Sequence, residues 1–565
     1  IRCPREKTGS FAIPDSVTSI GADAFLGCSS LESIVIPNSV ISIGKGAIYH
    51  CSSLKSITIG GGITSVESWN FADCPSLRTL KFNGDIDAVP FRSIVASIST
   101  LKKVVLGPDV TSIPDGAFRD CSSILSIAIP DSVTSIGYDA FYGCDSLSYK
   151  VEGGLRYLGN EKNPYLAVIG VVDRSVSNAA INDSARVIAG GAFHGCSSLK
   201  SVVIPDSVTS IGEYAFYGCD SLSYKVEGGL RYLGNEKNPY LAVIGVVDRS
   251  VSNAAINDSA RVIAGGAFHG CSSLESFVVS SDNQAYSSTD GVLYSKDGKT
   301  LILCPEGRKG SLVIPDSVTS IDASAFDGCS SLESIEVSVG NQTYSSNDGV
   351  LYSKDGKTLI LCPQGKKGSL VIPDGVKSIE SNAFLACSSL ESVVIPDSVA
   401  SILDNAFRDC SSLESVTIGG GITFIGSSVF EACDSLDTLT INGDIDAVPF
   451  RSIVASISTL KKVVLGSGVT TIPERAFDGC RYLQSVVIPD SVISIGEYAF
   501  YGCDSLVFVF IPDSVISIGE YAFYGCSSLE TIYCAAKEKP TGWDDNWNHG
   551  CSADVIWDCF SSNDI

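Results

Sequence analysis

The sequence predicts a β-rich repeat solenoid, because a segment of 23 residues recurs along nearly the whole chain. A fixed period of this length is typical of chains whose copies stack in a row. Each copy then buries its apolar residues against its two neighbours, so 565 residues need not divide into several globular domains. Fifteen cysteines mark the same place in successive copies: Cys28, Cys51, Cys74, Cys121, Cys144, Cys196, Cys219, Cys271, Cys329, Cys387, Cys410, Cys433, Cys480, Cys503 and Cys526.

Each copy is expected to form one coil with two short strands and a helical turn. The first strand is predicted over 31–36, with Leu31, Ile34 and Ile36 facing the core, and it ends at Pro37, which cannot donate to a strand ladder. Pro-Asn-Ser, or Pro-Asp-Ser in other copies, then predicts a tight turn. The alternating Ser-Val-x-Ser-Ile predicts the second strand, and Ala-Phe-x-Gly-Cys closes the coil with Ala, Phe and Cys inside.

Some copies depart from this pattern. The first coil is partial, and we expect Ile1 to Ser10 to cap the solenoid. In two identical segments, 83–107 and 442–466, Phe-Arg-Ser-Ile-Val-Ala-Ser replaces Ala-Phe-x-Gly-Cys. We therefore predict helices over 92–99 and 451–458 on the convex side of the solenoid.

The middle of the chain carries insertions that predict β-hairpins at about 152–180, 227–255, 280–311 and 338–369. The first two belong to identical segments, 144–199 and 219–274, and each has two strand-like runs around an Asn-Pro turn. The other two contain Asp-Gly between apolar strands, which is a strong hairpin signal.

The repeat is expected to span 1–533 and to be followed by a C-terminal cap over 534–565. Trp543, Trp547 and Trp557 fall in this last segment. Bulky aromatic rings cover the final apolar layer of a solenoid efficiently, so capping is the favoured interpretation. A tryptophan-lined ligand site is the alternative.

The charge of the chain excludes some partners. With 63 acidic and 39 basic residues the net charge is −24, which disfavours nucleic acid. This charge is interpreted as a source of solubility, with an acidic face for Ca²⁺ or basic partners as the alternative. No apolar run approaches the ~20 residues that span a bilayer. The chain contains no methionine, so Ile1 is expected to be a processed or internal start, and a lost leader or anchor is left open.

The repeated cysteines are interpreted as small buried hydrophobic residues. Stacked coils place them in one column with parallel side chains, which is poor geometry for disulfides. Six cysteines lie outside the column, and a disulfide among the last three of them is left open: Cys3, Cys304, Cys362, Cys534, Cys551 and Cys559.

No catalytic, cofactor-binding or metal site is predicted. The histidines His50, His194, His269 and His549 are isolated, and the cysteines lack zinc-ligand spacing. No serine lies in a nucleophile elbow. Aspartates that follow proline are interpreted as turn formers, with a calcium ladder as the alternative. Three sequons, beginning at Asn182, Asn257 and Asn341, matter only if the source glycosylates its proteins.

The repeat, with its Leu-x-x-Ile-x-Ile core and Ile-Pro-Asp-Ser-Val and Ala-Phe-Tyr-Gly-Cys motifs, resembles the BspA-like class of leucine-rich repeats. That class is found in surface antigens of mucosal bacteria and protozoa, and the resemblance covers essentially the whole chain. It implies a right-handed, curved solenoid with a parallel sheet on its concave face. It also implies extracellular or cell-surface display and a role in attachment.

One place on the predicted sheet face differs from the rest. Most outward positions are small, but Phe508 and Phe510 are expected to point outward, with Tyr533 one coil further on. Clustered exposed aromatic residues are typical of binding hot spots, so these three are the predicted ligand-binding residues. The alternative is that the C-terminal cap folds over them.

Two functions follow from these features. The first is a non-enzymatic extracellular or cell-surface adhesion protein that binds an extracellular protein or glycan. The second is a structural building block of an extracellular fibre or sheet, in which the hairpins mediate homo-assembly. An enzyme is not expected, because small, flat repeat columns offer no deep pocket for a perturbed acid or base.

Overall fold

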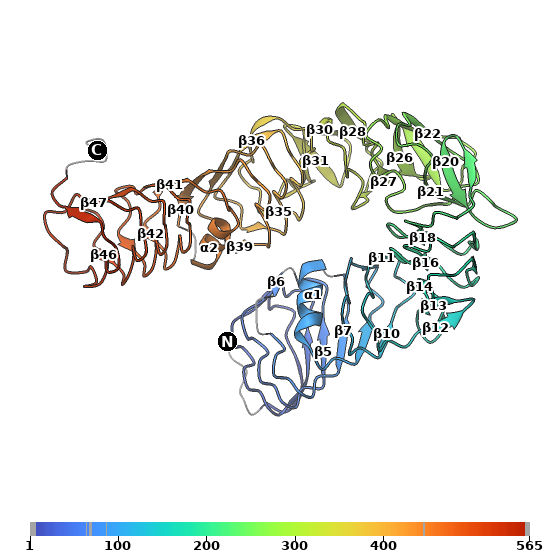
Figure 1. The fold of residues 1–565 in the computed structure, drawn as a ribbon, viewed down its shortest axis with the longest axis horizontal. Helices are drawn as coiled ribbons and strands as arrows, with labels where there is room; N and C mark the ends of the chain where they lie inside the picture. The colour runs from blue at the N-terminus through green and yellow to red at the C-terminus, as the bar shows by residue number, and fades with distance from the viewer. Residues whose placement is uncertain (1–6, 64, 67–69, 86–87, 445–446, 560–565) are drawn as a thin grey trace. The chain divides into compact units, whose positions relative to one another are not determined.

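In the computed structural model, which describes residues 7–63, 65–66, 70–85, 88–444 and 447–559, the chain forms short strands joined by tight turns. The chain divides into two compact units, Ile1–Asp297 and Gly298–Ile565. In each unit successive coils stack side by side, with equivalent strands next to one another (Figure 1). This is the β-rich repeat solenoid that the sequence predicts.

The first strand of a coil follows the predicted pattern of burial. In β3 (Leu31–Ile36) the side chains of Leu31, Ile34 and Ile36 are buried, whereas Val35 is exposed. Equivalent strands pair in parallel one repeat apart, so that Ile34 lies beside Ile57. In the first unit these strands form a sheet in the order β1 (Gly9–Ala12), β3, β5 (Ser56–Ile59), β7 (Thr79–Phe82), β8 (Lys103–Leu106) and β10 (Ser126–Ala128).

The second unit repeats this arrangement. Its long sheet contains β34 (Gly368–Val371), β36 (Leu390–Ile395), β38 (Ser415–Ile418), β40 (Thr438–Gly443), β41 (Lys462–Gly468) and β43 (Ser485–Val487). Three further parallel pairs lie between the two long sheets along the chain. Two belong to the first unit, β15 (Asn178–Ala180) with β17 (Ser201–Val203) and β22 (Asn253–Ile256) with β24 (Ser276–Val279). The third, β28 (Gly310–Ile314) with β30 (Leu332–Val337), belongs to the second unit.

The second strand of each coil is only two residues long. Most of these strands pair in parallel with their counterparts one coil away, whereas those at 262–263 and 320–321 pair in parallel with the last strand of an insertion. The two-residue strands are β2 (Ser19–Ile20), β4 (Ser42–Ile43), β6 (Ser65–Val66), β9 (Ser112–Ile113), β11 (Ser135–Ile136), β16 (Val187–Ile188), β18 (Ser210–Ile211), β23 (Val262–Ile263), β29 (Ser320–Ile321), β35 (Ser378–Ile379), β37 (Ser401–Ile402), β39 (Phe424–Ile425), β42 (Thr471–Ile472), β44 (Ser494–Ile495) and β46 (Ser517–Ile518).

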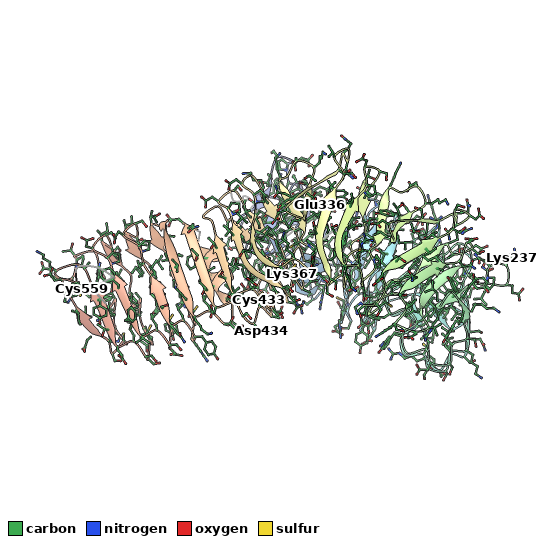
Figure 2. All side chains as sticks on the ribbon, turned by 90° about the horizontal axis from the view of Figure 1, so that it is seen from above. Lys237, Glu336, Lys367, Cys433, Asp434 and Cys559 are labelled. Atoms are coloured by element: carbon green, nitrogen blue, oxygen red, sulfur yellow. The ribbon has the colours of Figure 1, made fainter. Side chains whose placement is uncertain are left out.

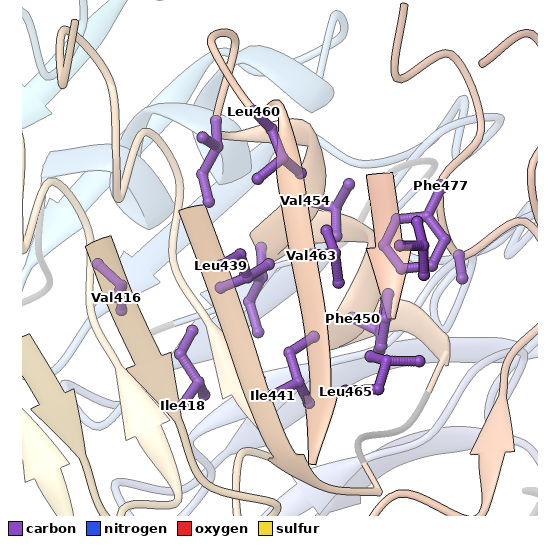
Figure 3. Packing of buried hydrophobic residues seen from close by; sticks show 14 of the residues in the cluster. Val416, Ile418, Leu439, Ile441, Phe450, Val454, Leu460, Val463, Leu465 and Phe477 are labelled. Atoms are coloured by element: carbon purple, nitrogen blue, oxygen red, sulfur yellow. The ribbon is translucent and has the colours of Figure 1, made fainter. Parts of the chain in front are cut away.

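A continuous column of apolar side chains from successive coils runs from Ile13 to Ala189 in the first unit and from Val350 to Trp547 in the second. Figure 3 shows the column around β38, β40 and β41, where Val416, Leu439 and Val463 lie in consecutive strands. Phenylalanines from the helical turns stack in the same core, and the rings of Phe384 and Phe407 lie 4.4 Å apart. Each coil therefore seals the apolar interior of the next.

The two predicted helices exist, but their limits differ from the prediction. They are α1 (Ala88–Ser97) and α2 (Ala447–Ala455), and each begins four residues earlier than expected. A proline lies in the first turn of each helix, where an N–H has no partner within the helix, so the helix starts before it without penalty. Phe91 of α1 takes the place of the coil phenylalanine, with its ring 5.2 Å from that of Phe118.

The first two insertions are three-stranded antiparallel meanders. In the first, β12 (Lys150–Glu152) pairs with β13 (Leu155–Leu158), which pairs with β14 (Ala167–Val171). The last strand then joins the solenoid by pairing in parallel with β16. The second copy contains β19 (Lys225–Glu227), β20 (Leu230–Leu233) and β21 (Ala242–Val246). Lys237, in its β20–β21 connection, is exposed at the periphery (Figure 2).

The insertions with Asp-Gly turns also contain antiparallel strands. β25 (Tyr286–Thr289) pairs with β26 (Val292–Ser295), and β27 (Thr300–Leu303) pairs in parallel with β29. In the fourth insertion β31 (Tyr344–Asn347), β32 (Val350–Ser353) and β33 (Thr358–Leu361) form a meander. Inserted hairpins are therefore present in all four predicted segments.

The ends of the solenoid differ. Residues 1–6, including Cys3, lie outside the described part of the chain, whereas Gly9 and Ser10, which we expected in a cap, belong to β1 and pair with β3. At the other end β48 (Asp554–Ile556) extends the sheet of β45 (Phe508–Ile511) and β47 (Thr531–Cys534). Trp543 and Trp547 are only 3% exposed, which favours the capping interpretation over a tryptophan-lined ligand site.

The repeated cysteines make a contact that the sequence does not predict. All twenty cysteines in the described residues are thiols, so no disulfide joins Cys534, Cys551 or Cys559. Within the described ranges, seven thiols of the column donate to the carbonyl oxygen of the phenylalanine 26 residues earlier, as Cys410 does to Phe384 at 3.1 Å and Cys433 to Phe407 at 3.0 Å. Cysteine is thus small enough for the core and also satisfies a buried backbone acceptor.

Candidate functional site

The predicted ligand-binding residues lie together on one face of the last sheet. Phe508 and Phe510 alternate with buried Val509 and Ile511 along β45. In the neighbouring strand Tyr533 lies directly beside Phe510. The ring centroids of Phe508 and Tyr533 are 6.5 Å apart and the rings are nearly perpendicular. We call Phe508, Phe510 and Tyr533 the C-terminal aromatic patch.

The C-terminal segment extends this patch along the sheet. Ile556 of β48 lies beside Tyr533, and both Ile556 and Phe508 are 45% exposed, whereas Phe510 and Tyr533 are half-buried. Val487, which holds on β43 the place that Phe510 holds on β45, is 46% exposed. Within the described part of the C-terminal segment, residues 534–559, β48 pairs at the edge of the sheet beside the patch. The patch gains an aliphatic residue that sequence reasoning missed.

A second exposed aromatic array lies on the helical turns of the last coils. The rings of Tyr498 and Tyr521 stack with centroids 5.4 Å apart, and those of Tyr501 and Tyr524 stack at 5.5 Å. The Arg475 guanidinium lies over Tyr498 at 4.7 Å. The signal was present in the sequence, because the motif Glu-Tyr-Ala-Phe-Tyr-Gly-Cys stands in two successive copies, at 497–503 and 520–526.

At the Pro-Asp-Ser turns, side chains after proline accept hydrogen bonds from neighbouring segments, and in two coils the donor is the backbone of the next coil. Asp397 Oδ1 accepts a hydrogen bond of 2.9 Å from the Gly420 N–H. Asn38, at the same place in an earlier coil, accepts one of 3.1 Å from the Gly61 N–H. These contacts agree with the turn-forming interpretation. No group of three or more His, Cys, Asp or Glu side chains suited to a metal ion occurs within the described ranges.

Three thiols of the cysteine column are poorly suited to nucleophilic chemistry. Burial raises the pKa of Cys144, Cys219 and Cys480 to about 12. A thiol with such a pKa stays protonated near neutral pH, and the thiolate is the nucleophile. In the part of the chain that the structure covers, no helix is long and apolar enough to cross a membrane.

These parallel strands, each coil beginning with a buried leucine, define a solenoid of the leucine-rich-repeat class. The BspA type leucine-rich repeat region matches the sequence in 6 copies, over residues 5–97, 92–161, 173–237, 309–350, 364–480 and 451–542. The matches cover well over half of the chain, and the chain belongs to this family. The resemblance seen in the sequence is thereby confirmed. No protein of curated function matches the sequence.

The chain is similar to several solved bacterial structures. A leucine-rich repeat protein from Eubacterium ventriosum is 22% identical with a TM-score of 0.38, and the match covers 71% of this chain and 98% of that one. A leucine-rich cell surface protein from Faecalibacterium prausnitzii is 23% identical (TM-score 0.21, 94% and 88% covered). The pneumococcal vaccine antigen PcpA is 15% identical (TM-score 0.27, 98% and 89% covered). These values are too low to indicate a shared function.

Proposed function

We propose that the chain is a non-enzymatic extracellular or cell-surface adhesion protein, and that its C-terminal aromatic patch contacts an extracellular protein or glycan. The observation that carries this proposal is the grouping of Phe508, Phe510 and Tyr533 on one sheet face, where Phe508 and the adjoining Ile556 are exposed. Exposed aromatic residues that lie together are typical of binding hot spots. The cell-surface and antigen names of the structural neighbours agree with display outside the cell.

The test is a binding screen against extracellular-matrix proteins and glycans, followed by the double variant Phe508→Ala/Phe510→Ala. Truncating a hot-spot residue costs about 2 kcal/mol or more, so the double variant should weaken binding by at least about 30-fold. The matched control is Val313→Ala/Val371→Ala, which removes two outward-facing residues, 53% and 65% exposed, from equivalent strands β28 and β34. Equal affinities for the two variants would remove the patch from the binding site.

The alternative function, a building block of a fibre or sheet, is less well supported by the sheet edges. The outer hairpin strands β12 and β19 are exposed throughout, and each has the sequence Lys-Val-Glu. Charged side chains on an edge strand discourage pairing with another chain. Light scattering over a concentration series separates the two functions. A constant molar mass supports the binding function, and a mass that grows with concentration supports assembly.

A further inference from the structure

Two equivalent pockets lie in the first unit, where each of the duplicated meanders packs against the helical turns of the adjacent coils. The first pocket has a volume of about 410 Å³ and is lined by Tyr149, Arg156, Arg174 and His194 among others. The second has a volume of about 570 Å³ and is lined by their counterparts Tyr224, Arg231, Arg249 and His269. Because the two segments are identical in sequence, the same side chains converge twice.

One arginine in each pocket is held in place by its neighbours but has an N–H group without a hydrogen-bond partner. The guanidinium of Arg156 lies 4.8 Å from the centre of the Tyr149 ring, and Arg231 lies at the same distance from Tyr224. One terminal N–H group of Arg156 donates to the Val172 carbonyl at a long 3.5 Å. Its Nε is buried and has no hydrogen-bond partner, and the same is true of Arg231. A fixed cation with unsatisfied N–H groups is suited to receive an anion.

The guanidinium of the second arginine in each pocket lies close to a glycine, which has no side chain to fill the space beside it. A Cβ placed on Gly270 would lie 3.4 Å from Arg249 Nη1, and one on Gly195 would lie 3.8 Å from Arg174 Nη1. Within the described ranges none of the four arginines forms an ion pair. Two arginines without carboxylate partners are unusual in a chain with a net charge of −24.

The acidic side chains differ between the two pockets. Asp145 lines the first pocket and its counterpart Asp220 lines the second. The first pocket also contains Asp139, which lies 3.5 Å from Arg119, whereas Tyr214 takes this place in the second. The second pocket therefore has one negative charge fewer and one aromatic ring more.

The two pockets adjoin each other. Tyr217 lines the second pocket, and its ring stacks on His194 of the first with centroids 5.5 Å apart. Tyr217 is 61% exposed, so a flat ring face is open to solvent between the two sites. Two adjacent pockets that share most of their side chains suit a ligand that itself repeats, because binding at one site raises the effective concentration at the next.

We propose that these twin pockets bind an acidic polysaccharide, with the carboxylate of one sugar residue on the arginines of each pocket and sugar rings against the tyrosines. Arginine forms two parallel hydrogen bonds with a carboxylate, and a tyrosine offers an apolar face with a polar tip. This site lies in the first unit and the C-terminal aromatic patch lies in the second. The two proposals therefore stand or fall separately.

The test measures binding of the full chain to a hexamer of galacturonic acid by calorimetry, with maltohexaose as the neutral control. The hexamer should bind and maltohexaose should not, and the monomer of galacturonic acid should bind at least about tenfold more weakly than the hexamer. Arg231→Gln/Arg249→Gln should reduce hexamer affinity by about tenfold or more, because it removes both cations of the second pocket. Arg156→Gln/Arg174→Gln should reduce it by a smaller factor.

Two further variants keep the test informative if the double variants fold poorly. Tyr214→Asp gives the second pocket the acidic residue of the first and should weaken binding by about threefold. Arg481→Gln removes an exposed arginine of the other unit and should leave binding unchanged. Hexamer affinity that is the same in wild type, Arg249→Gln and Tyr214→Asp would overturn the proposal. Binding of sulfate or of a glutamate hexapeptide as tight as that of the sugar hexamer would overturn the assignment to an acidic polysaccharide.

Discussion

The substitution Phe407→Ala tests how strongly neighbouring coils depend on each other. The Phe407 side chain is completely buried, and its ring lies between Phe384 at 4.4 Å and Phe430 at 5.2 Å. Removing the ring abolishes contacts on both sides and leaves a cavity, which in protein cores costs about 3–5 kcal/mol. Because a solenoid is stabilised mainly between nearest neighbours, the loss should be concentrated in the coils that contain these three rings.

Hydrogen–deuterium exchange measured by mass spectrometry resolves this effect along the chain. A loss of about 3 kcal/mol corresponds to exchange more than about 100-fold faster, and we expect it in peptides that span 384–430. Peptides from 20–60, in the other unit, should be unaffected. Arg408→Ala is the control, because this neighbouring side chain is exposed and its pairs with Asp409 and Glu431 lie on the surface. A change below about fivefold in 384–430, or one spread evenly over the chain, would refute the reasoning.

Two further predictions concern polar groups inside the solenoid. Asn341 is fully buried, and its side-chain amide donates to the carbonyls of Pro315 and Val318 while its oxygen accepts from two backbone N–H groups. Asn341→Ala should cost about 3 kcal/mol or more in urea unfolding, and a loss below about 1 kcal/mol would contradict this account. Alkaline pH should also destabilise the fold. Because burial raises the pKa of Cys144 and Cys480 from 9.0 to about 12, the unfolded chain releases protons first, so the free energy of unfolding should fall as pH rises from 9 towards 12. A urea midpoint that is constant between pH 8 and pH 10.5 would argue against it.

The coil itself was predictable because its signals are local and repeated. The alternation in Leu31–Ile36 and the proline that follows are enough to assign the buried face and the end of the strand. The glycines at 419–421 stand at the place of the Pro-Asp-Ser turn in their coil. The structure adds the reason for Gly421, where a Cβ would collide with the Asp397 carbonyl oxygen of the preceding coil.

Contacts between coils were harder to predict, because they depend on groups that the repeat brings together only in three dimensions. The thiol of Cys410 was interpreted as an apolar group, and its bond to the Phe384 carbonyl depends on how the adjacent coils stack. The sequon at Asn341 looks like a surface glycosylation site, yet four backbone groups surround its side chain. The same bonds predict that Asn341 carries no glycan even in a glycosylating host.

In the candidate sites too, features set by a local sequence pattern were predictable, and features set by packing between coils were not. Strand alternation alone placed Phe508, Phe510 and Tyr533 on one face, but only the pairing of β48 showed that Ile556 joins them. The twin pockets were visible in the sequence only as an identical duplication. Their arginines and tyrosines come from both the meanders and the coils, so their convergence could not be derived from spacing.

Alkylation of the native chain, without reductant, tests most directly whether adjacent coils seal a common interior that holds reduced cysteines. The account predicts that Cys387, Cys410 and Cys503, which are completely buried, resist iodoacetamide in the native chain and react fully once urea unfolds it. Partly exposed Cys559 should react in both states. Labelling of the three buried thiols at the rate of Cys559 in the native chain, or labelling that requires a reductant after unfolding, would contradict it.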